Sequence, residues 1–401
     1  MRVTVIGGGA AGCFAAIELK RREPSADVIL LEAGPRTLAK VAVTGGGRCN
    51  LTNSFAHVES LEKVYPRGFR LMRRALQTFS NEDTVRWFES EGVRLVTQAD
   101  DCVFPASQDA MQIVRTLQNL MSRLGVEVHT ESAVVSVEPG FRCRLRDGSS
   151  IDSDKVIVTT GGSPRLSGLS FLEGLGLEIV SPVPSLFTMK VGDIGLNSLT
   201  GTLAEVVIGI AGTPFRASGT LLLTDWGISG PAALKLSSYA ARHLADADYR
   251  GILLVNWLPS CEDIPSLLSG LLASSPQKQL SSIHPDGITA RLWEHLLSRA
   301  GLRPGIRCAE TGSKGISRLA EVLRADTYPI TGRVHFKEEF VTCGGVSLRE
   351  INPSTMESRK YPGLYFAGEV LDIDAVTGGF NLQAAWSTGY CAAIACLRQN
   401  Q

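Results

Sequence analysis

RVTVIGGGAAGCFAAIELKRREPSADVILLEA, residues 2 to 33, decides the fold of this chain. An apolar run at 3–6 is followed by glycines at 7, 9 and 12, by a helical stretch from Ala10 to about Arg22, and by a second apolar run at 28–31. This order predicts a strand, a G-x-G-x-x-G turn, a helix and a second strand. Together these elements form a dinucleotide-binding unit.

Each glycine of this turn has a physical task. Gly7 turns sharply, Gly9 lets backbone N–H groups approach a pyrophosphate, and Gly12 lets the helix and strand pack closely. The helix N-terminus adds free N–H groups and the positive end of its dipole. Glu32, 20 residues beyond Gly12, is placed to accept hydrogen bonds from ribose hydroxyls and disfavours a 2′-phosphate. The unit alone does not distinguish FAD from NAD.

Composition indicates an ordinary globular protein with a small partner. Of 401 residues, 44% are hydrophobic and 20% charged, and 40 basic residues balance 40 acidic ones. We therefore expect no nucleic-acid or membrane partner. The nine cysteines contain no C-x-x-C pair, which suits a reducing cytosol. Since the first strand starts at Arg2 and no apolar run is long enough to cross a bilayer, we expect a cytoplasmic protein without a signal peptide.

The rest of the chain alternates helical and strand patterns. Helical spacing covers 71–92 and 109–124, and strand patterns cover 126–153, with a tight turn at Asp147-Gly148. A buried strand within 154–162 delivers Thr160 and Gly161 at its carboxyl end, where open α/β sheets bind ligands. Residues 186–258 are rich in strands and predict a small barrel or sandwich, and 262–325 predict short helices.

The segment LYFAGEVLDIDAVTGGFNLQAAWSTG, residues 364–389, supplies a strand, an acidic glycine-rich loop and a helix start at the far end of the chain. A domain for NAD would be completed directly after the first unit, whereas here the completing strand arrives last. Such a loop can bond ribityl hydroxyls and direct N–H groups at a flavin ring. This closure favours FAD.

Four segments carry a family resemblance: TGGGRCNLTN at 44–53, TLLLTDWGISGPAAL at 220–234, FKEEFVTCGGVSL at 336–348, and 364–389. They resemble the hallmark segments of the aminoacetone-oxidase-like bacterial flavoproteins, whose relatives include a bile-acid dienone reductase. The resemblance implies an α/β fold with a split Rossmann-type FAD-binding domain of the glutathione-reductase type, an inserted β-barrel and a helical subdomain. The implied ranges are 1–185 and 336–401 for the FAD domain, 186–258 for the barrel, 259–325 for the helices, and 326–335 for a return strand.

The resemblance also implies a set of cofactor-binding residues. The ADP half would be held by Gly7, Gly9, Ala11, Gly12, Glu32 and Ala33, with the backbone of Val134 at the adenine. The flavin side would be lined by Lys40, Thr44, Gly45, Gly46, Gly47, Arg48 and Asn50, and by Thr160 and Gly161. Ribityl and ring would be held by Gly368, Glu369, Asp372, Gly378, Gly379, Phe380, Asn381 and Gln383.

Two residues are candidates for chemistry beyond the flavin. Cys49 adjoins Arg48, which could lower the pKa of its thiol, or it packs as a small buried side chain. Asp225 stands where family members have a histidine, so it removes a proton donor, and it either steers a cationic substrate or caps the turn before Gly227. Neither residue belongs to a metal-ligand or hydrolytic motif.

These observations predict an FAD-dependent oxidoreductase that transfers a hydride between flavin N5 and a small amine, ketone or enone bound beside the inserted barrel. Because a second G-x-G-x-x-G unit is missing, NAD(P)H would act only as a transient electron donor. Two alternatives remain open: a flavin-dependent tRNA-modifying methyltransferase, which needs a basic face, and a flavin-binding redox sensor without its own turnover. The substrate and the oligomeric state are not specified by the sequence.

Overall fold

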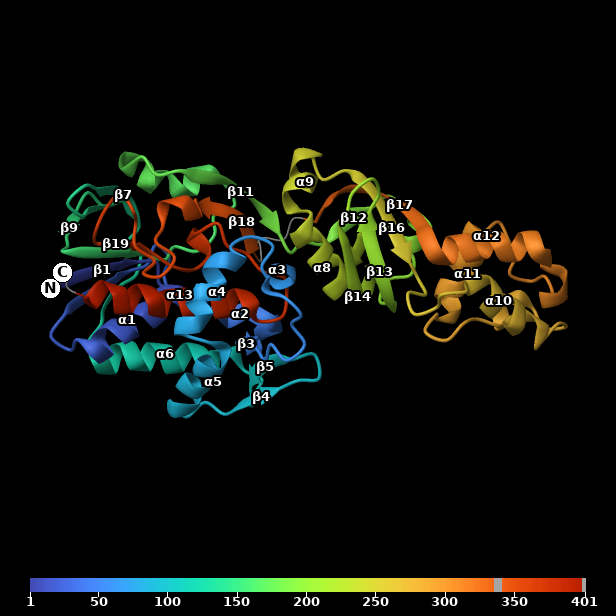
Figure 1. Ribbon diagram of the computed structural model, residues 1–401, viewed down its shortest axis with the longest axis horizontal. Coiled ribbons are helices and arrows are strands. Elements are labelled where there is room, and N and C mark those ends of the chain that lie inside the picture. Colours follow the sequence, from blue (N-terminus) through green and yellow to red (C-terminus); the bar gives the residue numbers. More distant parts are fainter. Residues whose placement is uncertain (335–340, 399–401) are drawn as a thin grey trace. The chain divides into compact units, whose positions relative to one another are not determined.

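The computed structural model describes residues 1–334 and 341–398, and its chain forms two compact units. Unit 1 comprises Met1–Val183 and Val341–Gln401, and unit 2 comprises Pro184–Phe340. Unit 2 is thus inserted in the sequence between the two parts of unit 1 (Figure 1). Each unit is described separately below.

Unit 1 is built on a five-stranded parallel sheet in the order β19-β10-β1-β2-β6. The strands are β1 (Arg2–Ile6), β2 (Asp27–Leu31), β6 (Glu127–His129), β10 (Lys155–Val158) and β19 (Leu364–Phe366). Continuous runs of buried side chains in β1, β2, β10 and β19 explain their place inside a parallel sheet. The last strand of the chain therefore completes the sheet begun by the first.

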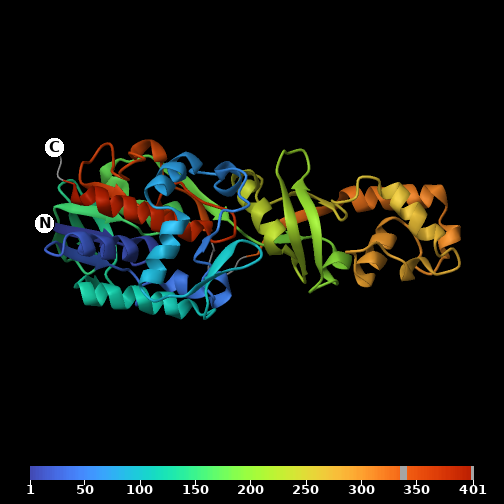
Figure 2. The ribbon, with the colours of Figure 1, turned by 60° about the horizontal axis from the view of Figure 1, so that its bottom comes forward.

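Helices α1 (Ala10–Arg22), α6 (Ala110–Leu124) and α13 (Phe380–Leu397) lie side by side in unit 1, with α1 in the middle (Figures 1 and 2). Smaller helices surround them: α2 (Ala39–Gly47), α3 (Leu61–Val64), α4 (Phe69–Thr78) and α5 (Asn81–Ser90), with 3₁₀ turns at Leu166–Leu175, Leu348–Glu350 and Gly368–Val370. The helical pattern at 71–92 forms two helices rather than one, because Ser80 caps α5 through a capping box with Asp83.

Three small sheets complete unit 1. The first sheet has the order β3 (Thr52–Asn53), β5 (Cys102–Pro105), β4 (Leu95–Thr97). The second has the order β7 (Val134–Glu138), β8 (Arg142–Leu145), β9 (Ser150–Asp152), and the third pairs β11 (Ile179–Ser185) with β18 (Val341–Val346). The predicted turn at Asp147-Gly148 joins β8 to β9, and Gly148 has a φ of 90°.

Unit 2 contains a closed barrel in the order β12-β15-β14-β13-β16-β17. Its strands are Met189–Val191, Gly227–Ser229, Arg216–Thr224, Leu203–Ile210, Gly251–Asn256 and Asp326–Arg333 in that order. Helices α7 (Ile194–Asn197), α8 (Gly230–Tyr239) and α9 (Ala241–Asp246) interrupt the strands. The sequence did not reveal α8 and α9, because their apolar residues extend a region rich in strand patterns.

The predicted short helices between β16 and β17 are α10 (Ile264–Ala273), α11 (Ala290–Arg299) and α12 (Gly312–Ala325), with 3₁₀ turns at Leu280–Ser282 and Cys308–Glu310. Their buried residues join the barrel in one continuous apolar core, which includes Trp257 from the barrel end and Trp293 from α11. The predicted fold class, a Rossmann-type α/β domain with an inserted barrel and helices, is confirmed. Residues 335–340, which include the end of the predicted return strand at 326–335 and the start of the predicted last part of the FAD domain at 336–401, lie outside the described residues.

Candidate functional site

The glycine turn between β1 and α1 tolerates no side chain at two of its positions. Gly7 has a φ of 108°, and a Cβ there would lie 2.5 Å from the carbonyl oxygen of Thr159. A Cβ on Gly12 would lie 1.9 Å from the carbonyl oxygen of Gly7. Both distances are far below van der Waals contact. The predicted sharp turn at Gly7 and close packing at Gly12 are therefore confirmed.

The first turn of α1 is open and positively polarised. Gly9 is the N-cap residue, no side chain caps the helix, and the first turn has no acidic residue. A Cβ added at Gly9 would meet no described atom within 4 Å. Helix N-termini present unpaired N–H groups and a positive dipole end, which suit an anion. This turn fits a pyrophosphate.

The Glu32 carboxylate follows β2 and lies beside the glycine turn. Its Oε2 accepts a hydrogen bond from Gly8 N at 2.8 Å, and its Oε1 accepts one from Gly34 N at 2.7 Å. A carboxylate has about four lone-pair positions, so two remain for further donors. The two backbone bonds fix the carboxylate beside the glycine turn, where it could accept hydrogen bonds from a ribose, and the exposed Ala33 follows it.

The second glycine cluster interrupts α2. Thr44, Gly45 and Gly46 leave helical geometry, and Gly45, Gly46 and Gly47 have φ of 62°, 68° and 82°. A Cβ on Gly45 would lie 2.9 Å from Asn50 N, whereas Gly46 and Gly47 are open. This backbone leaves room for a ligand.

The side chains around this cluster fix its surroundings. Arg48 bonds Gly45 O at 3.2 Å, and its guanidinium lies 4.5 Å from the centre of the Phe104 ring. With its amide oriented to satisfy both neighbours, Asn50 accepts from Gly379 N at 3.1 Å and donates to Thr52 O at 3.0 Å. Asn50 thereby links the cluster to the far end of the chain.

Glu369 contacts residues from several separate segments of unit 1. Its Oε1 accepts from Thr342 N at 2.7 Å, its Oε2 lies 3.4 Å from Lys40 Nζ, and a Cβ on Gly162 would reach Oε1 at 2.5 Å. The exposed Thr160 and the left-handed Gly161 precede it at the carboxyl end of β10. The carboxyl end of β10 and the acidic glycine-rich loop within 364–389 therefore lie together around Glu369.

The segment at 364–389, called the closing segment below, packs directly on α1 at Gly368. A Cβ on Gly368 would lie 2.9 Å from the Ala11 side chain, so Ala11 forms the contact between the first helix and this loop. The amide of Gly368 donates to Thr388 Oγ1 at 2.8 Å, and the amide of Asp372 donates to Val346 O at 3.0 Å. The two halves of the nucleotide-binding domain meet here.

The loop at 378–383 is held from inside. Asn381 bonds both the N–H and the carbonyl of Ala375, at 2.9 and 3.0 Å. Gln383 is fully buried and bonds Thr52 and Thr84. Its side chain is thus committed to the protein, so we assign it a positioning role toward the loop. The buried Phe380 packs against Phe55 and Tyr65, whereas the half-buried Gly378 and Gly379 leave backbone accessible.

Cys49 is a packed side chain rather than an activated thiol. It is fully buried, and burial raises the pKa of its thiol to about 12. The expected lowering of this pKa by Arg48 is wrong, because the Arg48 guanidinium is directed to Gly45 O and Phe104. At neutral pH Cys49 is therefore protonated and no nucleophile.

Asp225 and Trp226 lie in unit 2, at the turn between β14 and β15, and both are exposed. The turn is closed by Thr224 Oγ1, which donates to Gly227 O at 3.0 Å, so the capping role considered for Asp225 belongs to Thr224. Gly227 is required here, since its Cβ would lie 2.2 Å from Met189 O.

Three structural features near the site or on α1 were not predicted from the sequence. Thr159 Oγ1 donates to Ile6 O and Gly7 O at 3.0 and 2.9 Å, which clamps the glycine turn. Arg67 Nε donates to Asp374 Oδ1 at 2.5 Å, and Asp374 is fully buried within the closing loop. The third is a pocket at the other end of α1. Sequence spacing gives no signal for partners so far apart in the chain. The cofactor contact at Val134, which begins β7, stays a prediction.

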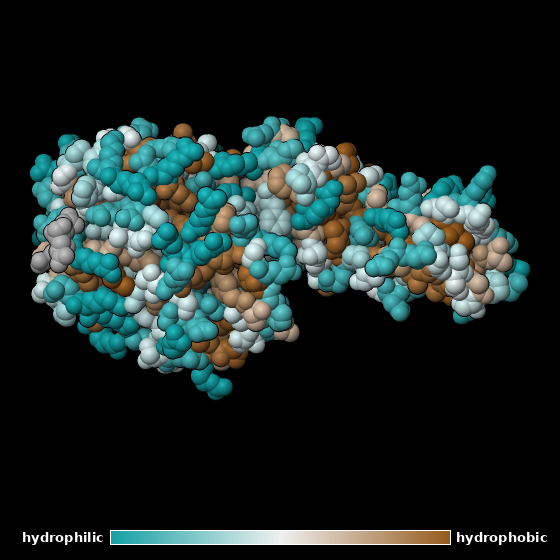
Figure 3. Space-filling model, in the orientation of Figure 1, coloured by the Kyte–Doolittle hydropathy of each residue, from teal (hydrophilic) through white to brown (hydrophobic). Residues whose placement is uncertain are grey.

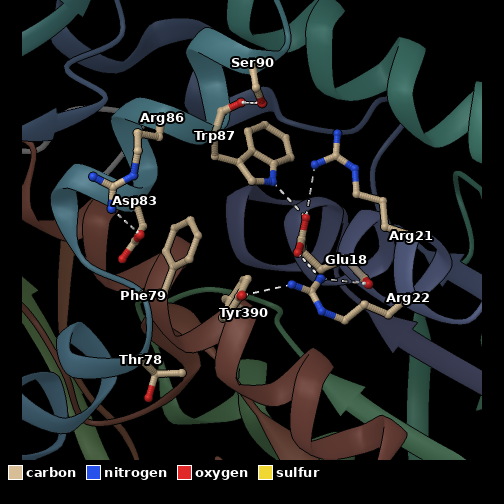
Figure 4. A pocket seen from close by; sticks show the side chains of 10 residues that line it. All are labelled: Glu18, Arg21, Arg22, Thr78, Phe79, Asp83, Arg86, Trp87, Ser90 and Tyr390. Atoms are coloured by element: carbon tan, nitrogen blue, oxygen red, sulfur yellow. Dashed lines mark hydrogen bonds and ion pairs between the residues drawn. The ribbon is translucent and has the colours of Figure 1, made fainter.

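The pocket of about 530 Å³ is lined by residues of α1, α4, α5 and α13 (Figure 4). At its floor Glu18 accepts from Trp87 Nε1 at 2.8 Å and pairs with Arg21 and Arg22, while Arg22 Nη2 donates to Tyr390 at 2.9 Å (Figure 4). Because these residues belong to the C-terminal half of α1, the pocket is separate from the glycine turn.

Two features of other protein classes were not found in 1–334 and 341–398. No helix there is long and apolar enough to cross a membrane. No group of three or more His, Cys, Asp or Glu in this part of the chain could hold a metal ion.

Comparison with known proteins places this arrangement in a family. The profile described as HI0933-like protein Rossmann domain matches residues 1–395. A 3-dehydro-bile acid delta(4,6)-reductase of Clostridium scindens is 29% identical, with 98% of each chain covered. A ribosomal RNA dihydrouridine synthase of Escherichia coli K12 is 30% identical, covering 97% of this chain and 96% of the relative. These matches confirm the family resemblance that the motifs predicted.

Among solved structures, a 3-ketosteroid-delta4-(5alpha)-dehydrogenase of Rhodococcus jostii matches with a TM-score of 0.48 and 14% identity, covering 99% of this chain and 96% of that one. A similarity this low carries no information about function.

Proposed function

The chain belongs to the HI0933-like Rossmann family and is an FAD-dependent oxidoreductase, and on this premise we propose that it reduces a carbon–carbon double bond conjugated to a carbonyl group. The proposed substrate is thus an enone rather than an amine or a saturated ketone. The observation that carries it is the chemistry shared by the names of the relatives. A delta(4,6)-reductase of a 3-oxo compound and a dihydrouridine synthase both saturate a double bond conjugated to a carbonyl.

The residues of unit 1 fit an FAD molecule. The uncapped first turn of α1 offers N–H groups to a pyrophosphate, and Glu32 offers a carboxylate to the ribose. The open backbone at Gly46, Gly47 and Gly161, together with Glu369, would hold the ribityl and ring side. The first turn has no acidic residue to repel the phosphates.

When bound, FAD would supply hydride chemistry: once reduced by two electrons from NAD(P)H, it would provide the hydride for the β-carbon of the substrate, and a proton from an acid or from water would complete the reduction at the α-carbon. The protein need only hold and orient the two partners. Cys49 is a poor proton donor, because burial raises the pKa of its thiol to about 12. Gln383 cannot carry a proton, because its amide side chain does not titrate and is bonded to Thr52. NAD(P)H serves as the transient electron donor in this proposal, since the dinucleotide unit at residues 2–33 is assigned to FAD.

The experiment is anaerobic reoxidation of the reduced holoprotein. The bound flavin is reduced by NADH or NADPH and then mixed with a 4-en-3-one steroid, a saturated ketone or a primary amine, while flavin absorbance is recorded. We expect reoxidation by the enone alone and formation of the saturated product. Reduction of the oxidised flavin by the amine, or no reoxidation by any enone including a uracil ring in RNA, would contradict the proposal.

A further inference from the structure

Helix α4 carries a concentration of positive charge on one face, called the α4 face below. Arg70, Arg73 and Arg74 are exposed there, and the helix has no acidic residue over its ten positions. The buried residues of the helix lie on its other side. None of the three guanidinium groups forms a hydrogen bond or an ion pair with the residues at 1–334 and 341–398.

The spacing of these arginines leaves their charges uncompensated. Arg73 and Arg74 lie three and four positions after Arg70, so the cations are neighbours on the helix surface, and like charges at this spacing destabilise a helix. Arg67, just before the helix, differs because it is bonded to the buried Asp374. A small anion with several charges would relieve this repulsion and accept bidentate hydrogen bonds from the guanidinium groups.

An aromatic ring lies beside the same arginines. Phe69 is half-buried, and the guanidinium carbons of Arg70 and Arg73 lie 5.6 and 5.9 Å from the centre of its ring. Aromatic rings and guanidinium planes both stack on nucleobases. The first turn of α4 thus offers a stacking surface for a base next to hydrogen-bond donors for a phosphate.

The residues in front of α4 are bonded to the part of the closing segment that is expected at the flavin. Tyr65 Oη donates to Phe380 O at 2.9 Å, and Arg67 Nε donates to Asp374 Oδ1 at 2.5 Å. A Cβ on Gly68, the N-cap residue of α4, would lie 2.6 Å from a side chain of the same segment. A ligand on the α4 face therefore starts beside the cofactor loop.

The glycine turn of residues 2–33 is unsuited to a nucleotide with a 2′-phosphate. The Glu32 carboxylate, held by the amides of Gly8 and Gly34, places a negative charge beside that turn. The proposed function assigns this unit to FAD and requires NADH or NADPH as the electron donor. The donor therefore needs a second binding place, and a 2′-phosphate, with a charge of about −1.5 to −2 at neutral pH, needs a basic one.

The size of the α4 face suits a small anion better than a nucleic acid or a membrane. Ten residues make a helix of about 15 Å, and the whole chain balances 40 basic against 40 acidic residues. No residue of α4 is among the exposed large hydrophobic residues of the described chain, so an apolar wedge for a bilayer is missing. Hydrophilic residues cover much of the face of unit 1 seen in Figure 3.

From these observations, and resting on the proposed function, we propose that the α4 face binds the adenosine 2′-phosphate of NADPH and so selects NADPH over NADH as the electron donor. Arg70, Arg73 and Arg74 bind the phosphates, and Phe69 lies against the adenine. NADPH gives up a hydride, which is two electrons and one proton, and leaves as NADP⁺. The oxidised flavin gains that hydride and one proton from water, which yields the reduced state that the enone consumes.

The test measures binding of NADP⁺ and NAD⁺ to the FAD-loaded protein by isothermal titration calorimetry, because the oxidised nucleotides bind without reducing the flavin. The variant is R70Q/R73Q/R74Q, whose changes are all at exposed positions. The matched control is R2Q/R115Q/R142Q, which removes three exposed arginines of unit 1 that are each paired with an aspartate. We expect wild type and control to bind NADP⁺ about tenfold more tightly than NAD⁺, and the variant to bind both equally.

Equal binding of the two nucleotides by the wild type, or an unchanged preference in the variant, would overturn the proposed site. Binding of single-stranded RNA that is tighter than binding of NADP⁺ and is lost in the variant would overturn it as well, since the α4 face would then belong to a polymer. Anaerobic stopped-flow reduction of the flavin is the kinetic counterpart: we expect the wild type to react faster with NADPH than with NADH, and the variant to lose that difference.

A second measurement separates this site from the proposed function. The flavin is reduced with dithionite, without any nucleotide, and is then mixed with the 4-en-3-one steroid. Reoxidation by the steroid without a preference for NADP⁺ refutes the α4 site alone. A preference for NADP⁺ without reoxidation by any enone refutes the proposed function alone.

Discussion

Helix α1 begins and ends in opposite ways. At its start Gly9 provides no side-chain cap and the first turn has no acidic residue, so its N–H groups are left for a ligand. Near its end the Glu18 carboxylate, 2% exposed, is enclosed by Arg21, Arg22 and Trp87. Polar groups at the second end bond to side chains of the protein, whereas the first end has no side-chain cap. The N-terminal end of α1 is thus open to a ligand, whereas its C-terminal end contributes to the stability of the fold.

The largest effect on the difference between the two ends of α1 is expected from a substitution at Gly12. A Gly12→Val variant places atoms into the Gly7 carbonyl and the Thr159 hydroxyl, so we expect a loss of about 3 kcal/mol in the free energy of unfolding, the upper end for an overpacked site. Urea denaturation measures it. The control is Gly9→Ala, where the added Cβ meets open space, so that stability is retained and FAD affinity falls. Equal stability of Gly12→Val and the wild type would contradict the packing role of Gly12.

The second end is tested at Glu18. A Glu18→Ala variant leaves Arg21 and Arg22 without their shared carboxylate and the Trp87 N–H without its acceptor. Because these arginines keep some access to water, we expect a loss of about 2–3 kcal/mol, at or below the lower end for a broken buried pair. FAD affinity should not change. Glu82→Ala, at an exposed carboxylate, is the control, and a large drop in FAD affinity in Glu18→Ala alone would show that the two ends are coupled.

A substitution at Glu32 tests the uncapped N-terminal end of α1. A Glu32→Gln variant keeps one acceptor for the Gly8 or Gly34 amide and removes the charge that faces the ribose. We expect FAD affinity to fall about tenfold, or about 1.4 kcal/mol, with little change in unfolding of the FAD-free chain. Fluorescence titration of FAD gives the affinity. An affinity equal to that of the wild type would remove Glu32 from the site.

Two cysteines near the cofactor half give the smallest effect. Burial raises the pKa of Cys49 to about 12 and also raises the pKa of Cys13, which lies within α1. A raised folded-state pKa contributes stability that is present below the unfolded value, near 8.5–9, and is lost as pH rises toward the folded value. We expect the native protein to resist iodoacetamide at these thiols at pH 8 and stability to decline above about pH 9. Rapid native labelling of Cys49, located by mass spectrometry, would contradict its burial.

The two ends of α1 also differ in how far the sequence predicts them. Gly7, Gly12 and Glu32 follow from spacing within a single unit, because each fits a contact that only that residue type allows. Glu18 and its partner Trp87 lie 69 positions apart, and Arg67 and Asp374 lie 307 apart, so no local pattern announces them. The break between α4 and α5 was missed because the apolar spacing continues across Ser80, whose capping bonds end it.

The candidate site shows the same division between backbone and side chains. Two glycines predicted at the cofactor, Gly45 and Gly161, have left-handed backbone, with φ of 62° and 75°. Predictions for side chains depended on neighbours that the sequence does not specify: Gln383 is bonded inside the protein, and the Cys49 thiol is buried away from charge.

Ligand binding at the open end of α1 is the central claim, and titration of the flavin-free chain with FAD, FMN and NAD⁺ tests it most directly. Flavin fluorescence and calorimetry would report the affinity and the stoichiometry. We expect one FAD per chain, bound far more tightly than FMN or NAD⁺, because the pyrophosphate and the adenosine ribose both contribute through α1 and Glu32. NAD⁺ binding tighter than FAD, or equal binding of FMN and FAD, would contradict the account.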